Sequence, residues 1–570
     1  MKIAALDRKL LRDLLQMKGQ SLAIAMVIGV GVAMFVMYRS TFDALTATQA
    51  AYYEQSRFAD VFANAKRAPE GLARRVAAIP GVATVETRVV ADVTLDLPDL
   101  DEPATGRLVA LPAGREPRLN ALTLVRGRML AGEAGGGHSG GADEVLVAES
   151  FALAHGFEPG DTLAATLNGR RRRLTIVGVA LSPEYVFSVR PGDLLPDPDR
   201  FGVLWMEREA LAAAFDLEGS FNDLALSLSP GASEEDVIAR LDRLLAPYGG
   251  TGAIPRSLQT SHWYLDNELT QLANVGNFLP LLFLGVAAFL LNVVLARVVA
   301  VQREQIAALK ALGYANRALA AHYAKLSLAI AALGAVAGVA LGAWLGSGLT
   351  GIYGELYRFP ATVYALPPGR VLQAVGVALA AAALGALGGV RKAVTLPPAE
   401  AMRPEPPASY RESLLERAGL RRLLPPAARM ILRNLGRRPG RTAVAVGGIA
   451  VAGSLVILGA ALRDGIAVLL DEQLGVIQRQ DATVTFTEPA GERAVHELAR
   501  IPGVVRVEPF RAVPVRLRAG HRSRRTSIEG LARGAELRRV VDASGEVLEL
   551  PPGGLVLSTS LAGILGVEAG

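Results

Sequence analysis

Residues 326–349 read LSLAIAALGAVAGVALGAWLGSGL, and this stretch decides the class of fold. It contains no Asp, Glu, Lys, Arg or His and is long enough, as a helix, to cross a hydrocarbon core of about 30 Å. Glycine recurs at every fourth position, at Gly334, Gly338, Gly342 and Gly346, a spacing that lets two helix backbones approach closely in a membrane. The stretch therefore predicts a tightly packed membrane-spanning helix.

Four other stretches have the same apolar character, at residues 21–38, 278–296, 371–390 and 442–462. A single one could be the buried helix of a soluble protein, but five in a chain that is 51% hydrophobic predict a polytopic α-helical membrane protein. The first stretch is longer than the apolar part of a typical signal peptide, and no small-x-small cleavage site follows it. We therefore interpret it as a retained membrane anchor.

The distribution of charge predicts the topology. Residues 1–20 hold 5 basic and 2 acidic side chains, residues 297–325 hold 5 and 1, and residues 391–441 hold 12 and 4. Residues 39–277 instead hold 22 basic and 32 acidic side chains. By the positive-inside rule, the N-terminus and the two basic connections are expected in the cytoplasm and residues 39–277 outside. The basic balance is thus explained by topology, and no nucleic-acid partner is expected.

The large external segment predicts an α+β domain. Alternating apolar residues over 83–97 and 174–181 are typical of strands, and 233–245 has helical spacing. Apolar faces after the first span and before the second predict two further helices, either stalks continuous with the spans or ordinary helices of the external domain. Residues 131–142 form a glycine-rich stretch without the Lys-Ser/Thr of a phosphate-binding loop, so we assign it no nucleotide.

The chain repeats its own plan. Leu-Arg-Asp-Leu at 11–14 matches Leu-Arg-Asn-Leu at 432–435, and Ile-Pro-Gly-Val at 79–82 recurs at 501–504. Residues 145–160 also align with 555–570. We expect two tandem repeats, each a span followed by an external domain, of which the second is truncated and continues in a longer protein.

Sequence motifs for catalysis are missing. The chain has no GxxxxGK[ST] motif and no cysteine, and its six histidines are scattered without the spacing of metal ligands. We expect no catalytic, cofactor or metal site and no enzyme activity. Because the spans lack ionisable side chains, they also argue against an ion-coupled secondary transporter.

Residues 297–325 contain the most informative connection between spans. Ile306, Leu309 and Leu312 form an apolar stripe on a short predicted helix, which suits docking in the groove of a partner protein. An ordinary surface helix between two spans explains the same pattern equally well.

At this point the sequence resembles a family. The QREQIAALKALGY segment at 302–314, the TLPPAEAMR segment at 395–403 and the Leu-Arg-Asp-Leu at 11–14 are similar to those of FtsX/MacB-type ABC transporter permeases. The resemblance implies a permease with a MacB-like external domain, in the long two-repeat form, which works with a separate ABC ATPase subunit that binds the ATP. It also implies that the ATPase docks on Gln302, Arg303, Glu304, Ile306, Leu309, Lys310 and Gly313.

The resulting domain scheme places the protein in the bacterial inner membrane with a cytoplasmic N-terminus. Its parts are the leading helix 1–20, span 21–38, external domain 39–277, span 278–296, coupling loop 297–325, spans 326–349 and 371–390, cytoplasmic linker 391–441 with a second leading helix, span 442–462, and an incomplete second external domain 463–570.

The expected function is to couple ATP hydrolysis to movement of the external domains, for export or extraction of a lipid, lipoprotein, peptide or drug. Membrane lipids and a periplasmic adaptor or lipoprotein are the further partners considered. The alternative is a membrane scaffold that regulates an external enzyme such as a cell-wall hydrolase. The sequence does not identify the cargo.

Overall fold

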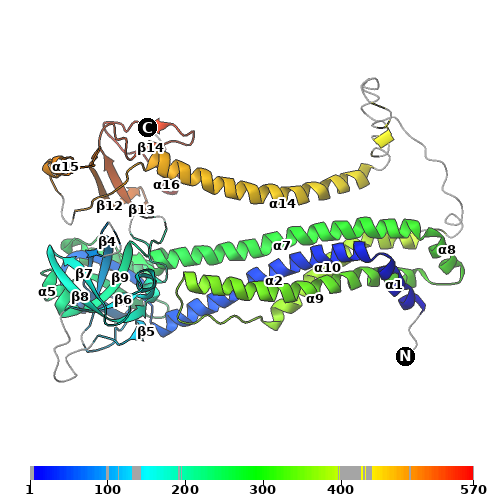
Figure 1. The fold of residues 1–570 in the computed structure, drawn as a ribbon, viewed down its shortest axis with the longest axis horizontal. Coiled ribbons are helices and arrows are strands. Elements are labelled where there is room, and N and C mark those ends of the chain that lie inside the picture. Colours follow the sequence, from blue (N-terminus) through cyan, green and yellow to red (C-terminus); the bar gives the residue numbers. More distant parts are fainter. Residues whose placement is uncertain are drawn as a thin grey trace. The chain divides into compact units, whose positions relative to one another are not determined.

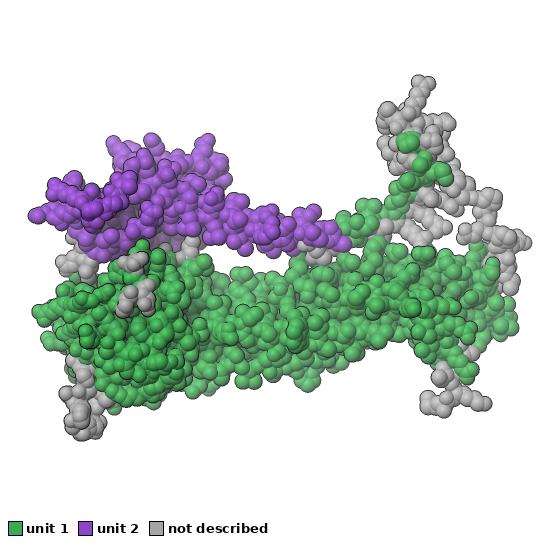
Figure 2. All heavy atoms as spheres, viewed as in Figure 1, with its two compact units in different colours: residues 1–451 green, residues 452–570 purple. Residues whose placement is uncertain are grey.

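The computed structural model describes residues 5–97, 102–112, 114–130, 143–190, 195–395, 439–486 and 490–568, with the single residues 100, 193, 397, 425, 427, 430, 431 and 435. The predicted loop 131–142, residues 432–434 of the second Leu-Arg-Asn-Leu segment and most of the linker 391–441 lie outside the described residues. The chain divides into two compact units, residues 1–451 and 452–570, which Figure 2 colours separately.

Long helices dominate the first unit. Its helical part consists of α1 (Ala5–Gln16), α2 (Lys18–Gln55), α7 (Thr260–Val301), α8 (Arg303–Ala311), α9 (Asn316–Leu356) and α10 (Pro368–Thr395). Figure 1 shows α2, α7, α9 and α10 side by side, with the α+β domain at one end and α1 and α8 at the other. Together with α14 (Pro439–Asp471), five helices of the described residues are long and apolar enough to cross a membrane.

Three helices extend well beyond the predicted spans. At 1.5 Å per residue, α2, α7 and α9 are each about 57–63 Å long, roughly twice the hydrocarbon thickness. The predicted stalks are therefore continuous with spans one and two. Their apolar faces are buried where expected, at Leu45 and Tyr52 on α2 and at Leu265 and Leu269 on α7.

The α+β domain contains two sheets. Its elements are β1 (Val61–Pro69), α3 (Leu72–Ala77), β2 (Val82–Arg88), β3 (Val90–Asp96), β4 (Ala104–Leu111), β5 (Thr123–Gly127), β6 (Glu144–Ala148), α4 (Glu149–His155), β7 (Thr162–Leu167), β8 (Arg170–Leu181), β9 (Phe201–Glu207), α5 (Arg208–Ala214), β10 (Ser220–Leu228), α6 (Glu234–Leu245) and β11 (Ile254–Pro255), with 3-10 turns η1 (Pro183–Tyr185), η2 (Ala246–Tyr248) and η3 (Arg256–Leu258).

One sheet has the order β11-β1-β10-β2, and its strands are antiparallel. The other has the order β5-β8-β6-β9-β4-β3-β7, and β7 also pairs with β8, so six of its strands close into a barrel. The barrel is filled by side chains such as Leu95, Leu108 and Leu174, each fully buried. The predicted strand at 83–97 is two strands, β2 and β3, which belong to different sheets.

The second unit contains η5, a π-helical turn (Glu472–Ile477), α15 (Glu492–Leu498), β12 (Phe510–Ala519), β13 (Arg522–Leu531), β14 (Val540–Val541), β15 (Val547–Leu548) and α16 (Thr559–Leu565). Its local geometry matches the first unit at the aligned positions. Gly81 and Gly503, in the repeated Ile-Pro-Gly-Val, have φ of 96° and 91°. Gly156 and Gly566, which end α4 and α16, both have φ of 66°.

Candidate functional site at the end of the helical bundle

The short helix α8 forms the connection between α7 and α9, at the end of the bundle remote from the α+β domain (Figure 1). Gln302 alone separates α7 from α8. Gly313 then turns the chain with φ of 90°, a conformation that side-chain-bearing residues rarely adopt, so the turn into α9 requires glycine.

One face of α8 is buried against the bundle. Ile306 is 1% exposed and lies among Val298, Leu319 and Tyr323, and Leu309 packs against the same cluster. Leu312, in contrast, is 78% exposed. Within the predicted docking stripe, Ile306 and Leu309 therefore hold α8 on its own bundle, and Leu312 is the residue that is open to a partner.

The other predicted interface residues also divide between inside and outside. The Lys310 Nζ donates to the Val394 carbonyl of α10 at 2.7 Å, so this side chain joins two helices of the bundle. Arg303 is half-buried, whereas Glu304 and Gly313 are exposed. Helical periodicity alone did not distinguish these faces, since a short helix with apolar residues on one side fits both a partner and its own bundle.

Gln302 belongs to a buried polar network that sequence analysis missed. Its side-chain oxygen accepts from Lys9 Nζ and from the Tyr323 hydroxyl, both at 2.9 Å, and its Nε2 donates to Asp13 at 3.1 Å. Asp13 is 3% exposed, accepts from Lys9 Nζ at 2.6 Å and lies 3.3 Å from His322 Nε2. The network thus joins α1 to the start of α8 and to α9. The only sequence signal was the acidic residue within the basic leading segment.

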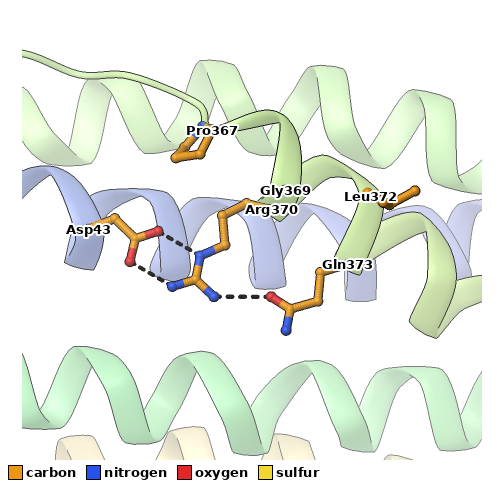
Figure 3. Close-up of a pocket in the computed structure, with 6 residues that line it drawn as sticks. All are labelled: Asp43, Pro367, Gly369, Arg370, Leu372 and Gln373. Carbon is orange, nitrogen blue, oxygen red and sulfur yellow. Dashed lines mark hydrogen bonds and ion pairs between the residues drawn. The ribbon is translucent and has the colours of Figure 1, made fainter.

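At the opposite end of the bundle, an ion pair joins α2 to α10. Arg370 donates from Nε and Nη2 to the two oxygens of Asp43, at 2.6 and 2.8 Å, and from Nη1 to Gln373 at 3.0 Å (Figure 3). These residues line an open pocket of about 680 Å³ together with Pro367, Gly369 and Leu372. Because the guanidinium is already paired bidentately, this pocket offers no free cation.

Where the bundle meets the α+β domain, a buried charge cluster joins the sheet that contains β2 and β10 to the turn η1, which follows β8 of the other sheet. Arg88 of β2 donates to Asp223 of β10 at 2.7 Å and to both oxygens of Glu184 in η1 at 2.6 and 3.0 Å. Burial alone would lower the pKa of Arg88, but the two carboxylates raise it above its ordinary value. Burial raises the pKa of Asp223, against the opposing effect of Arg88.

The same cluster is hydrogen-bonded to the start of α7. Gln259, the N-cap residue of α7, donates to the Glu184 carbonyl at 2.8 Å, and Ser261 accepts from the Phe187 amide at 2.9 Å. Arg256 in turn donates to the carbonyls of Phe58 and Ala59, directly after α2. Both long helices are therefore fastened to the domain by polar contacts in addition to packing.

Residues 277–398 match the family model described as FtsX-like permease C-terminal. This part of the chain is similar to the C-terminal domain of FtsX-like permeases. The predicted family is thereby confirmed over α8, α9 and α10 and most of α7. Of the motifs on which the resemblance depended, the segment 302–314 lies inside the match and Leu-Arg-Asp-Leu at 11–14 lies outside it.

The solved structures that are similar to parts of the chain include two external regions of other proteins. The extracellular domain of the noncanonical ABC-type transporter YknZ from Gram-positive bacteria has 13% identity and a TM-score of 0.23, and covers 34% of this chain and 97% of its own. The periplasmic region of MacB from Actinobacillus actinomycetemcomitans has 11% identity and a TM-score of 0.23, and covers 38% and 94%. No curated protein sequence matches the chain.

Proposed function

We propose that this chain is the permease subunit of an ABC transporter, in which a separate ATPase subunit binds and hydrolyses ATP and the long helices transmit the resulting movement to the α+β domain. The observation that supports this most directly is the continuity of α2 and α7. Each runs without a break from the end of the bundle near α8 to the fastened junction at the domain. The FtsX-like permease domain that includes α8 supports the same proposal.

The ATPase docks on the exposed side of α8. Glu304, Gln305 and Ala308 are exposed there, and Leu312 presents a large apolar side chain at the turn that follows. An exposed apolar side chain rimmed by polar groups matches the apolar core and polar rim of a small protein interface. The buried side of α8 fixes the orientation of this docking surface. The contacts there are made within the bundle by Ile306, Leu309 and Lys310.

Leu312→Asp is therefore expected to release the ATPase without unfolding the permease. Loss of an apolar anchor and burial of a carboxylate should lower co-purification of an ABC ATPase at least about tenfold. The measurement is affinity purification of the full chain from its native cells, with mass spectrometry and ATP turnover of the eluate. Leu195→Asp, at another exposed leucine, is the matched control.

Leu309→Asp separates the two roles of α8. Leu309 packs inside the bundle, so Leu309→Asp would bury a carboxylate in an apolar cluster. We therefore expect this variant to lower the yield of monodisperse protein, whereas Leu312→Asp should lower only ATPase binding. If Leu312→Asp leaves the ATPase bound to a well-folded chain, the docking surface is wrong. If no ABC ATPase is enriched with the unmodified chain, the scaffold of an external enzyme becomes the better account.

The proposed orientation in the bacterial inner membrane has the N-terminus and residues 391–441 in the cytoplasm. The chain contains no cysteine, so a thiol reagent would label only a cysteine that is introduced by mutation. Arg67→Cys on β1, which lies in the α+β domain, should react with an impermeant maleimide added outside intact spheroplasts. Ala311→Cys on α8 should react only after lysis. The reverse pattern would invert the topology and exclude cytoplasmic docking on α8.

The two halves of the chain are proposed to be tandem repeats, so that one chain supplies two related external domains. Glu86 accepts the Arg118 amide at 2.7 Å, and the aligned Glu508 accepts the Leu537 amide at 2.9 Å. In both units the residues that follow bond to the segment just after a long helix: Asn120 donates its amide to the Arg57 carbonyl, and Arg539 donates to Ile477. Sequence-distant contacts of the same kind support a duplicated domain plan.

A further inference from the structure

Helix α7 has a proline in its interior, at the level where its stalk meets the predicted span. Pro280 is buried and lies close to the start of the predicted span 278–296. The other described helices that are long enough to cross a membrane, α2, α9, α10 and α14, have no proline beyond their first residue. Proline has no amide hydrogen, and its ring crowds the carbonyl four residues before it, so it weakens a helix at that turn.

The carbonyl that Pro280 leaves without its usual helical donor belongs to Gly276. In a regular helix, residue 280 would donate its amide to residue 276, and among the described residues no group outside α7 donates to this carbonyl. Gly276 is buried against α2, because a Cβ there would lie 2.9 Å from Tyr38 Cβ and 3.5 Å from Arg39 Cδ. The carbonyl therefore belongs to the contact between α7 and α2, beside the stem of Arg39.

Arg39 supplies a donor that also lacks a partner. Its Nε is buried and makes no hydrogen bond within the part of the chain that the structure describes. Asp43, one turn further along α2, is already held by Nε and Nη2 of Arg370. The Arg39 guanidinium carbon instead lies 5.9 Å from the centre of the Phe42 ring. A buried donor on α2 and a carbonyl acceptor on α7 thus meet at one helix contact without a bond between them, an arrangement that does not favour a single position.

We propose that residues 276–280 form a hinge with two positions. In the position that the structure shows, Arg39 Nε has no partner. In the second position α7 bends at Pro280, so that the Gly276 carbonyl tilts out of the helix and accepts from Arg39 Nε. The hydrogen bond that is gained offsets the cost of the bend, which keeps the two positions close in free energy.

The contacts on the two sides of the hinge determine which part moves. Towards the domain, α7 is held by polar contacts: Gln259 donates to η1, and the Tyr53 hydroxyl of α2 lies 3.1 Å from His262 Nδ1. On the other side the contact with α2 is apolar, and a Cβ at Gly31 would lie 3.1 Å from Phe283 Cβ. Directional polar bonds resist displacement, whereas packed apolar helices can slide by small amounts. The span part of α7, which leads into α8, is therefore the part that swings, and the use of this movement in transmission rests on the proposed function.

The test measures distances between spin labels in the full chain, reconstituted in nanodiscs without an ATPase. Met26→Cys with Val301→Cys joins α2 to the moving part of α7, and Ala47→Cys with Thr270→Cys joins α2 to the stalk part. All four positions are exposed, and the chain has no other cysteine. The first pair should give two distances, and the second pair should give one.

Two substitutions should remove the second position. Pro280→Ala restores an amide donor to Gly276, and Arg39→Met removes the donor from α2. Each should lower the population of the second distance about fivefold, which is the effect of one hydrogen bond. Pro368→Ala and Arg317→Met are the matched controls, because Pro368 is the first residue of α10 and Arg317 is exposed near the start of α9. Both controls should leave the two populations unchanged.

Three results would overturn this proposal. A single distance for the first pair in the parent chain excludes the hinge, and a second distance that persists unchanged in Pro280→Ala places any movement elsewhere. A second distance that persists unchanged in Arg39→Met excludes the bond to Gly276. Because the measurement contains no ATPase and no nucleotide, failure of the proposed docking on α8 would leave its result unaffected, and the two proposals fail separately.

Discussion

Gly338→Leu is expected to lower the thermal stability of the folded protein and its yield. A Cβ at Gly338 would lie 2.5 Å from the Gly29 carbonyl oxygen and 2.7 Å from Val32 Cβ, both on α2. The first of these is backbone, so it cannot move aside by a change of rotamer. A Cβ added at Gly334 or Gly342, one turn before and one turn after, would lie 2.5 or 2.6 Å from the carbonyl oxygen of Ala25 or Ala33. The neighbouring turns are therefore packed equally closely, and α9 cannot shift along α2 to make room.

The expected destabilisation is about 1–3 kcal/mol for overpacking, which corresponds to a fall of roughly 2–10 °C in the unfolding midpoint of the recovered protein. Gly348→Leu is the matched control, because it lies on the same helix α9 and a Cβ there meets nothing within 4 Å. The measurement is thermal stability of detergent-solubilised protein by size-exclusion chromatography. A normal midpoint for Gly338→Leu would mean that α2 and α9 do not pack through this glycine face.

The glycine spacing shows what sequence could predict here and what it could not. The length of an apolar stretch and the period of its small residues are local properties, so the spans and the close-packed face of residues 326–349 followed directly. The identity of the partner helix is not local. α2 packs on the glycines of α9, whereas Gly385 of α10 approaches the Ala288 carbonyl of α7, and no pattern in the sequence distinguished these pairings.

Contacts between distant residues explain most of what was missed in the candidate site. Asp13 meets Gln302 and His322 across separations of 289 and 309 residues, so neither contact leaves a local pattern. The burial of Ile306 and Leu309 is a related case. Their helical period was recognised, but whether the bundle or a partner covers them depends on where α9 and α10 lie. Family resemblance indicated the segment, but it carried no information on which side of α8 the bundle covers.

Arg88→Met is expected to destabilise the α+β domain by about 3–5 kcal/mol, since removing one partner leaves two buried carboxylates, Glu184 and Asp223, without their cation. Trp205, which is 2% exposed and lines the same small cavity as Arg88, reports on this junction. When the exposed Trp263 and Trp344 are replaced by Phe, the fluorescence of Trp205 alone is followed during urea unfolding of the full chain. The unfolding curves of the variant and the parent then give the loss in free energy of unfolding. Arg171→Met, at an exposed ion pair with Asp96, should change stability by less than about 0.5 kcal/mol.

The pH dependence of the stability loss distinguishes two causes: buried carboxylates without a cation, and lost side-chain packing. Burial raises the pKa of Asp223 even beside Arg88, and without the cation the pKa should rise further. A carboxyl group whose folded-state pKa exceeds its unfolded value binds more protons when folded, so its stabilising effect is present at low pH and is lost as pH rises through the folded pKa. The stability deficit of Arg88→Met relative to the parent chain should therefore shrink as pH falls from about 8 to about 5.

A rescue experiment tests the same cause. Adding Glu184→Gln and Asp223→Asn to Arg88→Met should recover part of the stability and remove the pH dependence of the deficit. A deficit that is constant with pH would show that Arg88 contributes mainly through packing, and the junction between the sheets would then not depend on its charge.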